Sequence, residues 1–329
     1  MAAEQPTLLE GIRGTVTADL AAVDATIRKE LASDVALVNQ VSEYIIGAGG
    51  KRLRPLLVLL AARAAGAPPL GPQVLAAVVI EFIHTATLLH DDVVDGSHQR
   101  RGRDTANEVW GNAASVLVGD FLYSRAFQMM VRLKSPRIME IMADATNIIA
   151  EGEVLQLMNA HDPDTTERRY LDVIYRKTAR LFESGAAIAA VLAGAEPAVE
   201  RALAAYGRHL GNAFQLVDDA LDYRGSTAER GKNIGDDLAE GKPTLPVIHT
   251  LRHGTADQQA LLRRAIETGG LEELPAVIKA IESSGGLEYT ARLAQGEADQ
   301  ALAALERLPK SVHCEALRQL AGFAISRSY

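Results

Sequence analysis

Apolar residues recur every three or four positions along most of the 329-residue chain, and this spacing is the strongest constraint on its fold. Val74, Val78, Phe82 and Leu89 illustrate the pattern. Residues at such intervals share one face of an α-helix, whereas apolar residues of a half-buried strand alternate with polar ones. The composition agrees, because alanine and leucine are abundant and only 5% of residues are aromatic. The sequence therefore predicts an all-α protein.

Glycine and proline divide this pattern into segments of helical length. The breaks fall at residues 47–55, 66–72, 95–104, 134–137, 161–166 and 194–197, and at the later TGG and SSGG. Residues 224–246 form a much longer polar, glycine-rich interruption, and we expect such a loop to be functional. We expect a single domain over residues 1–329, with its motifs within about 40–250. The alternative is a helical domain with a loosely attached C-terminal third.

Charge and cysteine content narrow the class of protein. The formal net charge of −8 argues against a general nucleic-acid-binding protein, so basic residues matter where they cluster. A single cysteine, Cys314, excludes an intrachain disulfide and a thiolate metal site, as is typical of a reducing cytosol. The first residues, MAAEQPTLLEG, lack the pattern of a signal peptide, and no uninterrupted apolar run has the length of a membrane span. We expect a soluble, cytoplasmic protein.

An aspartate-rich motif ends one of the most apolar segments. Asp91, Asp92 and Asp95 have DDxxD spacing, which places the first and last carboxylates on one helix face. Alone, this pattern is most often a solvated helix end. The same spacing ends another apolar segment, at Asp218, Asp219 and Asp222. Two such faces across a cavity suit Mg²⁺, which binds a few carboxylates, several waters and the oxygens of a diphosphate.

Basic residues in glycine-rich segments complete the pattern. They are Lys51, Arg52 and Arg54 in GGKRLRP, Arg100 and Arg101 after the first motif, Lys177 in YRKTAR, Lys232 in RGKNIG and Lys242 in EGKPTLP. A guanidinium group binds phosphate oxygens in pairs, and a lysine acts as a point charge. Singly, each is typical of a solvated surface. Together they predict a site for two polyanionic groups.

His84 has more than one interpretation. EFIH, residues 81–84, has the ExxH spacing of ferritin-like di-iron proteins, but that site needs a second such motif, which we do not find. His84 also lies two helical turns before Asp91 on the same face, so it can point into the same cavity. A hydrogen-bonded core histidine is the alternative.

Several motifs occur in an order that resembles a known family. GGKRLRP, HTATLLHDDVVD with RRG, KTA, FQLVDD and GDDLAEGKPTLP are similar to those of the trans-prenyltransferases, the all-trans isoprenyl diphosphate synthases. GNAASVLVGDF, RAFQMM and AEGEVLQLMN most resemble the octaprenyl diphosphate synthase subgroup. The resemblance implies a helical bundle of the isoprenoid synthase type around a deep central cavity, Mg²⁺ as cofactor and a homodimer.

The resemblance also implies a reaction. Isopentenyl diphosphate condenses successively, head to tail, with an allylic diphosphate such as farnesyl diphosphate, giving a membrane-seeking product of about forty carbons for quinone side chains. Isopentenyl diphosphate is assigned to Lys51, Arg54, His84 and Arg101, and the allylic diphosphate to Arg100, Lys177, Lys232, Lys242 and Mg²⁺ on Asp91, Asp95 and Asp218. Thr178 and Gln215 are assigned to the reacting carbons, Arg52 to substrate binding, and Asp92, Asp219 and Asp222 to catalysis within their motifs.

Small residues before the first motif bear on product length. Ala86 and Thr87 lie five and four residues before Asp91, where short-chain members of the family carry bulky aromatic side chains. We therefore expect a tunnel that stays open at this level and closes near Phe127, Met129 or Met130. Tight helix packing is the alternative explanation for the small residues.

Other functions remain open at this point. A shorter-chain synthase making geranylgeranyl or farnesyl diphosphate shares the motifs. A terpene cyclase or head-to-head synthase also ionises allylic diphosphates, but it lacks the second basic site that GGKRLRP and RRG supply. A noncatalytic partner subunit that binds prenyl diphosphates usually lacks one aspartate motif, and this chain has both.

Overall fold

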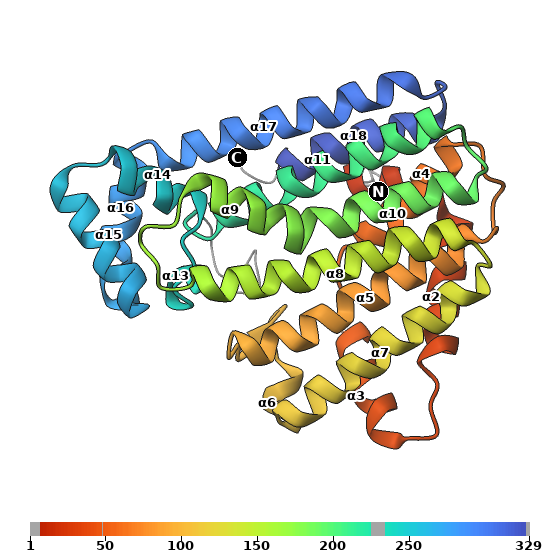
Figure 1. Cartoon of the computed structure of the whole chain (residues 1–329), viewed down its shortest axis with the longest axis horizontal. Coiled ribbons are helices and arrows are strands. Elements are labelled where there is room, and N and C mark those ends of the chain that lie inside the picture. Colours follow the sequence, from red (N-terminus) through yellow and green to blue (C-terminus); the bar gives the residue numbers. More distant parts are fainter. Residues whose placement is uncertain (1–6, 48, 225–233, 327–329) are drawn as a thin grey trace, which may run out of the picture.

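The computed structural model describes residues 7–47, 49–224 and 234–326 as a bundle of long helices (Figure 1). The first half of the chain supplies α1 (Leu8–Gly14), α2 (Thr17–Leu31), α3 (Ala36–Gly47), α4 (Leu53–Ala64), α5 (Gln73–Val94), α6 (Ala106–Trp110), α7 (Asn112–Arg132) and α8 (Pro136–Asn159). Between α5 and α6 lies a short hairpin of β1 (Gln99–Arg100) and β2 (Arg103–Asp104).

The second half is helical as well. It supplies α9 (Glu167–Ile174), the π-helical segment η1 (Tyr175–Ala179), α10 (Arg180–Leu192), α11 (Pro197–Leu221), α13 (Asp236–Ala239), α14 (Leu245–His253), α15 (Ala256–Thr268), η2 (Leu271–Glu273), α16 (Leu274–Ser283), α17 (Gly286–Ala304), η3 (Leu305–Arg307) and α18 (Val312–Ser326). The predicted all-α class is therefore confirmed. Of the long interruption at 224–246, the described part contains α13 and the start of α14.

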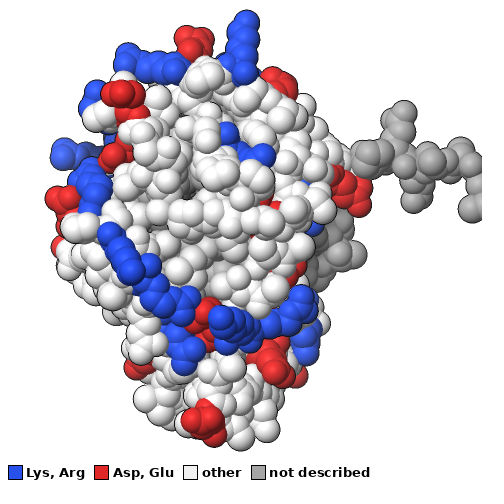
Figure 2. Space-filling view, turned by 90° about the vertical axis from the view of Figure 1, so that its right-hand side faces the viewer, with Lys and Arg blue, Asp and Glu red and all other residues white. Residues whose placement is uncertain are grey.

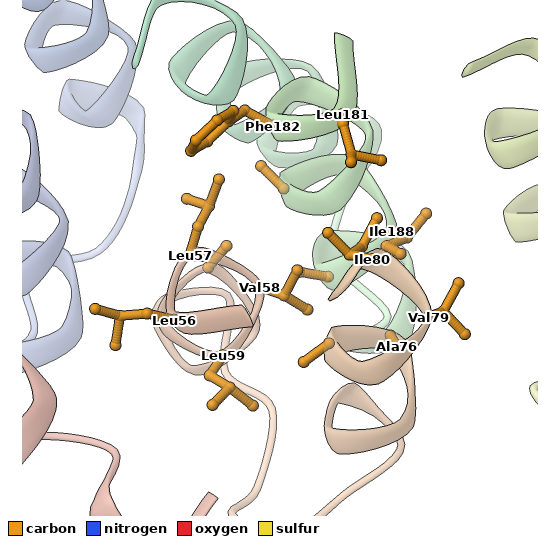
Figure 3. Packing of buried hydrophobic residues seen from close by; sticks show 14 of the residues in the cluster. Leu56, Leu57, Val58, Leu59, Ala76, Val79, Ile80, Leu181, Phe182 and Ile188 are labelled. Atoms are coloured by element: carbon orange, nitrogen blue, oxygen red, sulfur yellow. The ribbon is translucent and has the colours of Figure 1, made fainter. Parts of the chain in front are cut away.

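One part of the main core lies where α4, α5 and α10 meet (Figure 3). Helix α4 is apolar around most of its circumference, and Leu56, Leu57, Val58 and Leu59 are all fully buried. In Figure 3, Val58 points toward Ile80 of α5 and Leu57 toward Phe182 of α10. Leu56 and Leu59 point toward other parts of the core. Full burial of each large aliphatic side chain stabilises the fold by about 1.5–3 kcal/mol relative to exposure. This packing fixes the direction of α5, which ends in the first aspartate motif.

Helix α5 is long and apolar enough to cross a membrane, and it alone meets that test among the described residues. However, 67% of its apolar stretch is buried by the rest of the protein. A buried helix of this kind is the core of the bundle. Helices α2, α4, α7 and α10 pack against it.

The surface charges contribute much less to the stability of the fold than the apolar core does. Figure 2 shows the end of the bundle at which α5 begins, where Lys and Arg side chains form a band with carboxylates among them. Exposed pairs such as Arg137 with Glu140, 2.7 Å apart, contribute only about 0–1 kcal/mol each. Apolar packing, rather than surface charge, holds the helices together.

The π-helical segment η1 widens the backbone at the start of α10 and carries Lys177 and Thr178. Glycines on two neighbouring helices let them approach it closely. A Cβ atom on Gly152 of α8 would lie 2.9 Å from the backbone nitrogen of Lys177, and one on Gly211 of α11 would lie 2.5 Å from Cα of Ala179. Any larger residue must push these helices apart. Single π-turns inside helices are frequent at functional sites.

The C-terminal third packs on the same framework. Helix α17 runs along α11 and also contacts α14 and α18, while α18 packs against α4. A smaller apolar cluster joins α14, α15 and α16 to Ala220 and Tyr223, next to the second aspartate motif. The C-terminal helices therefore reach both the main core and the end of α11.

The close approach of α11 to η1 generates a stability prediction. Gly211→Ala should lower the free energy of unfolding by about 1–3 kcal/mol, because its Cβ would overlap the backbone of Ala179. Gly296→Ala is the matched control, since nothing lies within 4 Å of a Cβ at that helical position. The control should equal the wild type or gain up to about 1 kcal/mol. Urea unfolding measures both, and a Gly211→Ala protein as stable as the control would contradict the close approach.

Candidate active site

A cavity of about 690 Å³ opens where α4, α5, α8, α10 and α11 meet the loop before α14. Charged and polar side chains gather around it, and aromatic ones line it as well. The predicted residues among those that line it are Lys51, Arg52, Arg54, His84, Thr87, Asp91, Asp95, Arg100, Arg101, Lys177, Thr178, Gln215, Asp218, Asp219 and Lys242. Lys232 lies outside the described residues. The fold thus brings together residues that are up to 191 positions apart, from Lys51 to Lys242.

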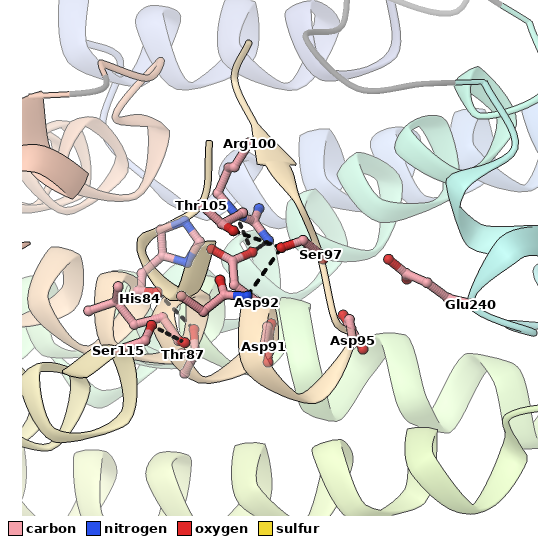
Figure 4. Close-up of polar contacts among 12 residues, drawn as sticks. His84, Thr87, Asp91, Asp92, Asp95, Ser97, Arg100, Thr105, Ser115 and Glu240 are labelled. Atoms are coloured by element: carbon pink, nitrogen blue, oxygen red, sulfur yellow. Dashed lines mark hydrogen bonds and ion pairs between the residues drawn. The ribbon is translucent and has the colours of Figure 1, made fainter. Parts of the chain in front are cut away.

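The three aspartates of the first motif differ in position. Asp91 and Asp95 line the cavity. Asp92 is fully buried, and its Oδ1 accepts hydrogen bonds from Nε and NH2 of Arg100, at 2.8 and 2.6 Å. Figure 4 shows Asp92 turned toward Arg100, and Asp95 facing Glu240 across the cavity. Asp92 therefore holds the Arg100 guanidinium in place, while Asp91 and Asp95 present carboxylate oxygens to the cavity.

The second motif divides in a similar way. Asp218 and Asp219 line the cavity. Asp222 is only 1% exposed, and its Oδ2 accepts the backbone N–H of Asp237 at 3.1 Å. The backbone carbonyl of Asp222 accepts a further bond from the N–H of Gly235. Asp222 thus ties the beginning of α13, and with it the loop that carries Lys242, to the end of α11.

Two lysines bridge the carboxylates around the cavity. Nζ of Lys177 lies 3.3 Å from Oδ2 of Asp91 and 2.5 Å from Oε2 of Glu153 on α8. Nζ of Lys242 lies 2.8 Å from Oδ2 of Asp95 and also pairs with Glu240. Burial alone would lower the pKa of each lysine, but these carboxylates raise both above their usual range.

Glu153 shows that this side of the cavity carries excess negative charge. Burial, followed by the charge of Asp91, raises the pKa of Glu153 to about 7, although Lys177 opposes the shift. Its Oε1 atom is buried without a hydrogen-bond partner. Burial is the first cause of this shift, and the negative charges of Asp91 and Asp95 add to it. This part of the cavity favours additional cations.

The opposite side of the cavity is basic. The Arg54 side chain is half-buried, and its guanidinium lies 4.5 Å from the ring centre of Phe182 and donates from NH1 to Nε2 of His84 at 3.0 Å. Burial lowers the pKa of Arg54 to about 10, and it lowers the pKa of His84 well below its usual range. His84 is therefore neutral and accepts from Arg54. Nε of Arg54 has no partner, so this site favours an anion.

A tight hairpin turn brings Arg101 to the same side. Arg101 and Gly102 both have positive φ, 55° and 72°, which suits a two-residue turn between β1 and β2. The Arg101 guanidinium donates to the carbonyl of Gly49. Gly50 has a φ of 132°, which favours glycine, and a Cβ there would lie 2.7 Å from NH1 of Arg101, so a larger residue would displace the guanidinium. GGKRLRP and RRG are thus neighbours in space.

The remaining basic residues of GGKRLRP also line the cavity, with different partners. Arg52 pairs with Asp24 of α2 at 2.7 Å. Nζ of Lys51 lies 5.4 Å from the ring centre of Phe323 on α18. The C-terminal helix therefore contacts the rim of the cavity.

A chain of hydrogen bonds runs along one wall of the cavity. Thr178 Oγ1 donates to Gln215 Oε1 at 2.8 Å, Gln215 Nε2 donates to Asp219 Oδ1 at 2.7 Å, and Tyr170 OH donates to Asp219 Oδ2 at 2.5 Å. Burial, followed by the charge of Asp237, raises the pKa of Asp219, and these two donors oppose that shift. No local sequence pattern singles out Tyr170 or Glu153, because only the fold brings them beside their partners.

The residues expected to govern tunnel length lie at different depths. Thr87 lines the cavity, whereas the preceding Ala86 is fully buried. Met129 and Met130 on α7 are fully buried in the main core, and Phe127 packs against it. The described lining of the cavity reaches Thr87 but not these α7 residues. Their part in a tunnel floor stays a prediction.

The ExxH pair does not resemble a di-iron site in its surroundings. Burial raises the pKa of Glu81, and the nearest opposing charges are those of Arg52, Arg54 and Arg101. Within the described ranges, no three His, Cys, Asp or Glu side chains converge closely enough to hold a metal ion by themselves, so a cation at the aspartates would need oxygens from water or a bound anion to complete its coordination. Cationic neighbours disfavour a metal ion beside Glu81 and His84.

Comparison with known proteins gives a consistent picture. Residues 35–282 match the model of the polyprenyl synthetase family. The chain is 55% identical over 320 residues to octaprenyl diphosphate synthase of Escherichia coli (strain K12), covering 97% of this chain and 99% of that protein. It is 48% identical to the all-trans-nonaprenyl-diphosphate synthase (geranyl-diphosphate specific) of Rhodobacter capsulatus, over 97% and 98% of the two chains.

Solved structures agree with the sequence matches. A polyprenyl synthase from Caulobacter crescentus CB15, complexed with calcium and isoprenyl diphosphate, superposes with a TM-score of 0.94 at 46% identity, over 98% of each chain. A decaprenyl diphosphate synthase from Rhodobacter capsulatus superposes with a TM-score of 0.90 at 46% identity, over 97% of this chain and 98% of that one.

Proposed function

This chain belongs to the polyprenyl synthetase family, and on that premise we propose that it is a long-chain all-trans polyprenyl diphosphate synthase. It adds isopentenyl diphosphate successively, head to tail, to an allylic diphosphate such as farnesyl diphosphate. The identity to octaprenyl diphosphate synthases supports a product of about forty carbons, of the kind used in quinone side chains. The observation that carries the proposal is one cavity with an excess of carboxylates on one side and a cluster of basic side chains on the other.

The acidic side fits a metal-bound diphosphate. Asp91, Asp95 and Asp218 offer the carboxylate oxygens that Mg²⁺ prefers, and Mg²⁺ keeps its remaining positions for water and phosphate oxygens. When bound, Mg²⁺ supplies electrostatic stabilisation of negative charge on the departing diphosphate. Lys177, Lys242 and Arg100 line the same side and would bind the diphosphate oxygens. Lys232, outside the described residues, is proposed for the same role.

The basic side fits the second diphosphate. Arg54, Arg101 and Lys51 line it, and neutral His84 can donate through the nitrogen that does not face Arg54. Arg52 lines the rim close by. Two separate cationic clusters hold two anions apart, which a condensation between two diphosphates requires.

The reaction follows from this placement. The allylic C–O bond breaks and its electron pair leaves with the diphosphate. The double bond of isopentenyl diphosphate attacks the resulting allylic cation and forms the new C–C bond. A proton is then lost to the departed diphosphate. Thr178 and Gln215, between the two sites, stabilise the cation through their oxygens.

The walls of the cavity protect this cation from water. Phe182 and Phe214 line it together with Leu53, Leu88 and Ile174. Apolar walls exclude water from a reactive intermediate. The apolar helices below the charged residues then receive the growing chain.

We also propose that the active form is a cytoplasmic homodimer and that the whole chain acts as one polyprenyl synthase domain. Exposed apolar side chains on the neighbouring helices α7 and α8 support the dimer, at Val116, Leu117, Val131, Val154, Leu157 and Met158. Exposed apolar patches of this kind mark interfaces. The packing of α17 along α11 supports a single unit. No nucleic acid is involved, and the apolar product itself partitions into membranes.

A noncatalytic prenyl diphosphate-binding subunit is a weaker candidate, because both aspartate motifs and both cationic clusters line the cavity. A shorter-chain synthase is disfavoured by the 52–55% identity to octaprenyl diphosphate synthases.

The proposed ionisation step predicts that turnover needs Mg²⁺ and both aspartate motifs. Asp91→Ala and Asp218→Ala should each lower kcat by at least about 100-fold, since each removes a carboxylate from the metal site. Asp120→Ala, which changes an exposed aspartate on α7, is the control and should keep wild-type turnover. Incorporation of labelled isopentenyl diphosphate measures all three. Full activity in excess chelator, or in either folded variant, would refute the mechanism.

The small residues on α5 predict control of product length. Thr87→Phe and Ala86→Phe should each shorten the product sharply without abolishing the first condensation, because a phenyl ring on this face blocks the path below the metal site. Thr87→Val is the control, since it keeps the volume, and should leave product length unchanged. Chromatography of the dephosphorylated products measures the result. If an active Thr87→Phe enzyme made products of wild-type length, this face of α5 would not form part of the tunnel wall.

A further inference from the structure

Four side chains from three elements form one continuous hydrogen-bonded chain beside the cavity. Thr178 lies in η1, Gln215 and Asp219 lie one turn apart on α11, and Tyr170 lies on α9. The three bonds measure 2.8, 2.7 and 2.5 Å, from Thr178 to Gln215, Gln215 to Asp219 and Tyr170 to Asp219. Asp219 is 4% exposed and Tyr170 is 5% exposed, so water competes little with these bonds.

The chemistry of the carboxylate sets the direction of this chain. Both oxygens of Asp219 accept hydrogen bonds, one from the Tyr170 hydroxyl and one from Nε2 of Gln215, so the Gln215 amide presents its nitrogen to Asp219. Its carbonyl oxygen then faces Thr178, and the Thr178 hydroxyl must donate to it. The hydroxyl proton of Thr178 therefore points toward Gln215, which leaves the oxygen lone pairs of Thr178 for the cavity.

This orientation matters for the reaction proposed above. A lone pair directed into the cavity stabilises a developing positive charge, whereas a hydroxyl proton directed there would oppose it. Preorganised dipoles act strongly because they need no rearrangement during the reaction. The fixed orientation of the Thr178 hydroxyl therefore stabilises the transition state more than it stabilises either bound substrate.

Tyr170 stands at the far end of the chain. Its hydroxyl holds the second oxygen of Asp219, and the aspartate is thereby fixed at both oxygens. Without this donor one buried oxygen of Asp219 lacks a partner, the carboxylate can turn, and the amide and hydroxyl that depend on it can reverse. Unpaired buried acceptors are costly, so the group would rearrange.

We infer that Tyr170 is a positioning residue for the condensation, acting through Asp219 and Gln215 to keep the Thr178 oxygen directed at the reacting carbons. The inference rests on the proposed synthase function. It also gives Asp219 a role different from that of Asp218, namely orientation of Gln215 in place of metal binding.

The test is Tyr170→Phe in the full-length protein, assayed in the first condensation of farnesyl and isopentenyl diphosphates. The phenyl ring keeps the cavity wall, and only the hydroxyl is lost. We expect kcat to fall about 10-fold to 100-fold. The KM of each substrate should change by less than about twofold, because the diphosphate sites are untouched.

Tyr206→Phe is the matched control. Its hydroxyl is also buried and donates to the carbonyl of Leu317 at 2.7 Å, within the main core. This variant loses a buried tyrosine hydrogen bond of the same kind, so it should lose similar thermal stability while keeping kcat within about twofold of wild type. A purely structural role for Tyr170 would make the two variants behave alike.

A double-mutant cycle with Thr178→Val tests whether the effect travels along the chain. In the Thr178→Val background, Tyr170→Phe should reduce kcat by less than about twofold, since the hydroxyl that it orients is gone. Asp219→Asn gives a second single-site test. The nitrogen of the asparagine amide donates hydrogen bonds and does not accept them, so this variant loses one of the two hydrogen bonds that Asp219 accepts. Its kcat should therefore fall as it does in Tyr170→Phe.

The outcomes separate the inference from the proposed function. If the wild type performs the condensation and Tyr170→Phe keeps its kcat, or if the losses in Tyr170→Phe and Thr178→Val simply multiply, the positioning role is wrong and the synthase function stands. If the wild type incorporates no isopentenyl diphosphate, the synthase function itself is wrong, and the inference is overturned with it.

Discussion

The burial of charges of both signs inside an apolar helix bundle is the constraint on which this structure depends. A lone buried charge costs far more than a single hydrogen bond stabilises, so buried ions must be paired. Lys177 and Lys242 accordingly lie between carboxylates, and Arg100 is held by Asp92. Arg54 instead contacts neutral His84 and the ring of Phe182. The two sides of the cavity still differ in sign, and that imbalance is what metal-bound and metal-free diphosphates would neutralise.

This arrangement needs helices that approach each other closely at one level. Gly152 and Gly211 let α8 and α11 touch the widened turn η1, which carries Lys177 and Thr178. Gly50 lets the hairpin arginine Arg101 reach the loop before α4. Backbone proximity at these glycines therefore sets the width of the cavity, and the packing of α4, α5 and α10 sets the direction from which the first aspartate motif enters it.

The sequence predicted the helical class, the two aspartate motifs and most of the charged residues of the cavity, because helical spacing and charge clusters are local patterns. It could not separate the aspartates within a motif. Asp92 binds Arg100 and Asp222 binds the backbone of Asp237, and both facts depend on where the chain returns after the helix ends. The hairpin, the π-turn and Tyr170 were missed for the same reason: Tyr170 and Asp219 are 49 positions apart, and only the packing of α9 near α11 joins them.

Product length links these features to function, because a long prenyl chain must extend from the charged part of the cavity into the space between the apolar helices. The deciding measurement uses the purified chain alone, with labelled isopentenyl diphosphate, farnesyl diphosphate and Mg²⁺, followed by chromatographic sizing of the dephosphorylated products. A single polypeptide with both diphosphate sites should yield an all-trans product of about forty carbons. Absence of incorporation, or products that stop at twenty carbons or fewer, would contradict a long-chain synthase.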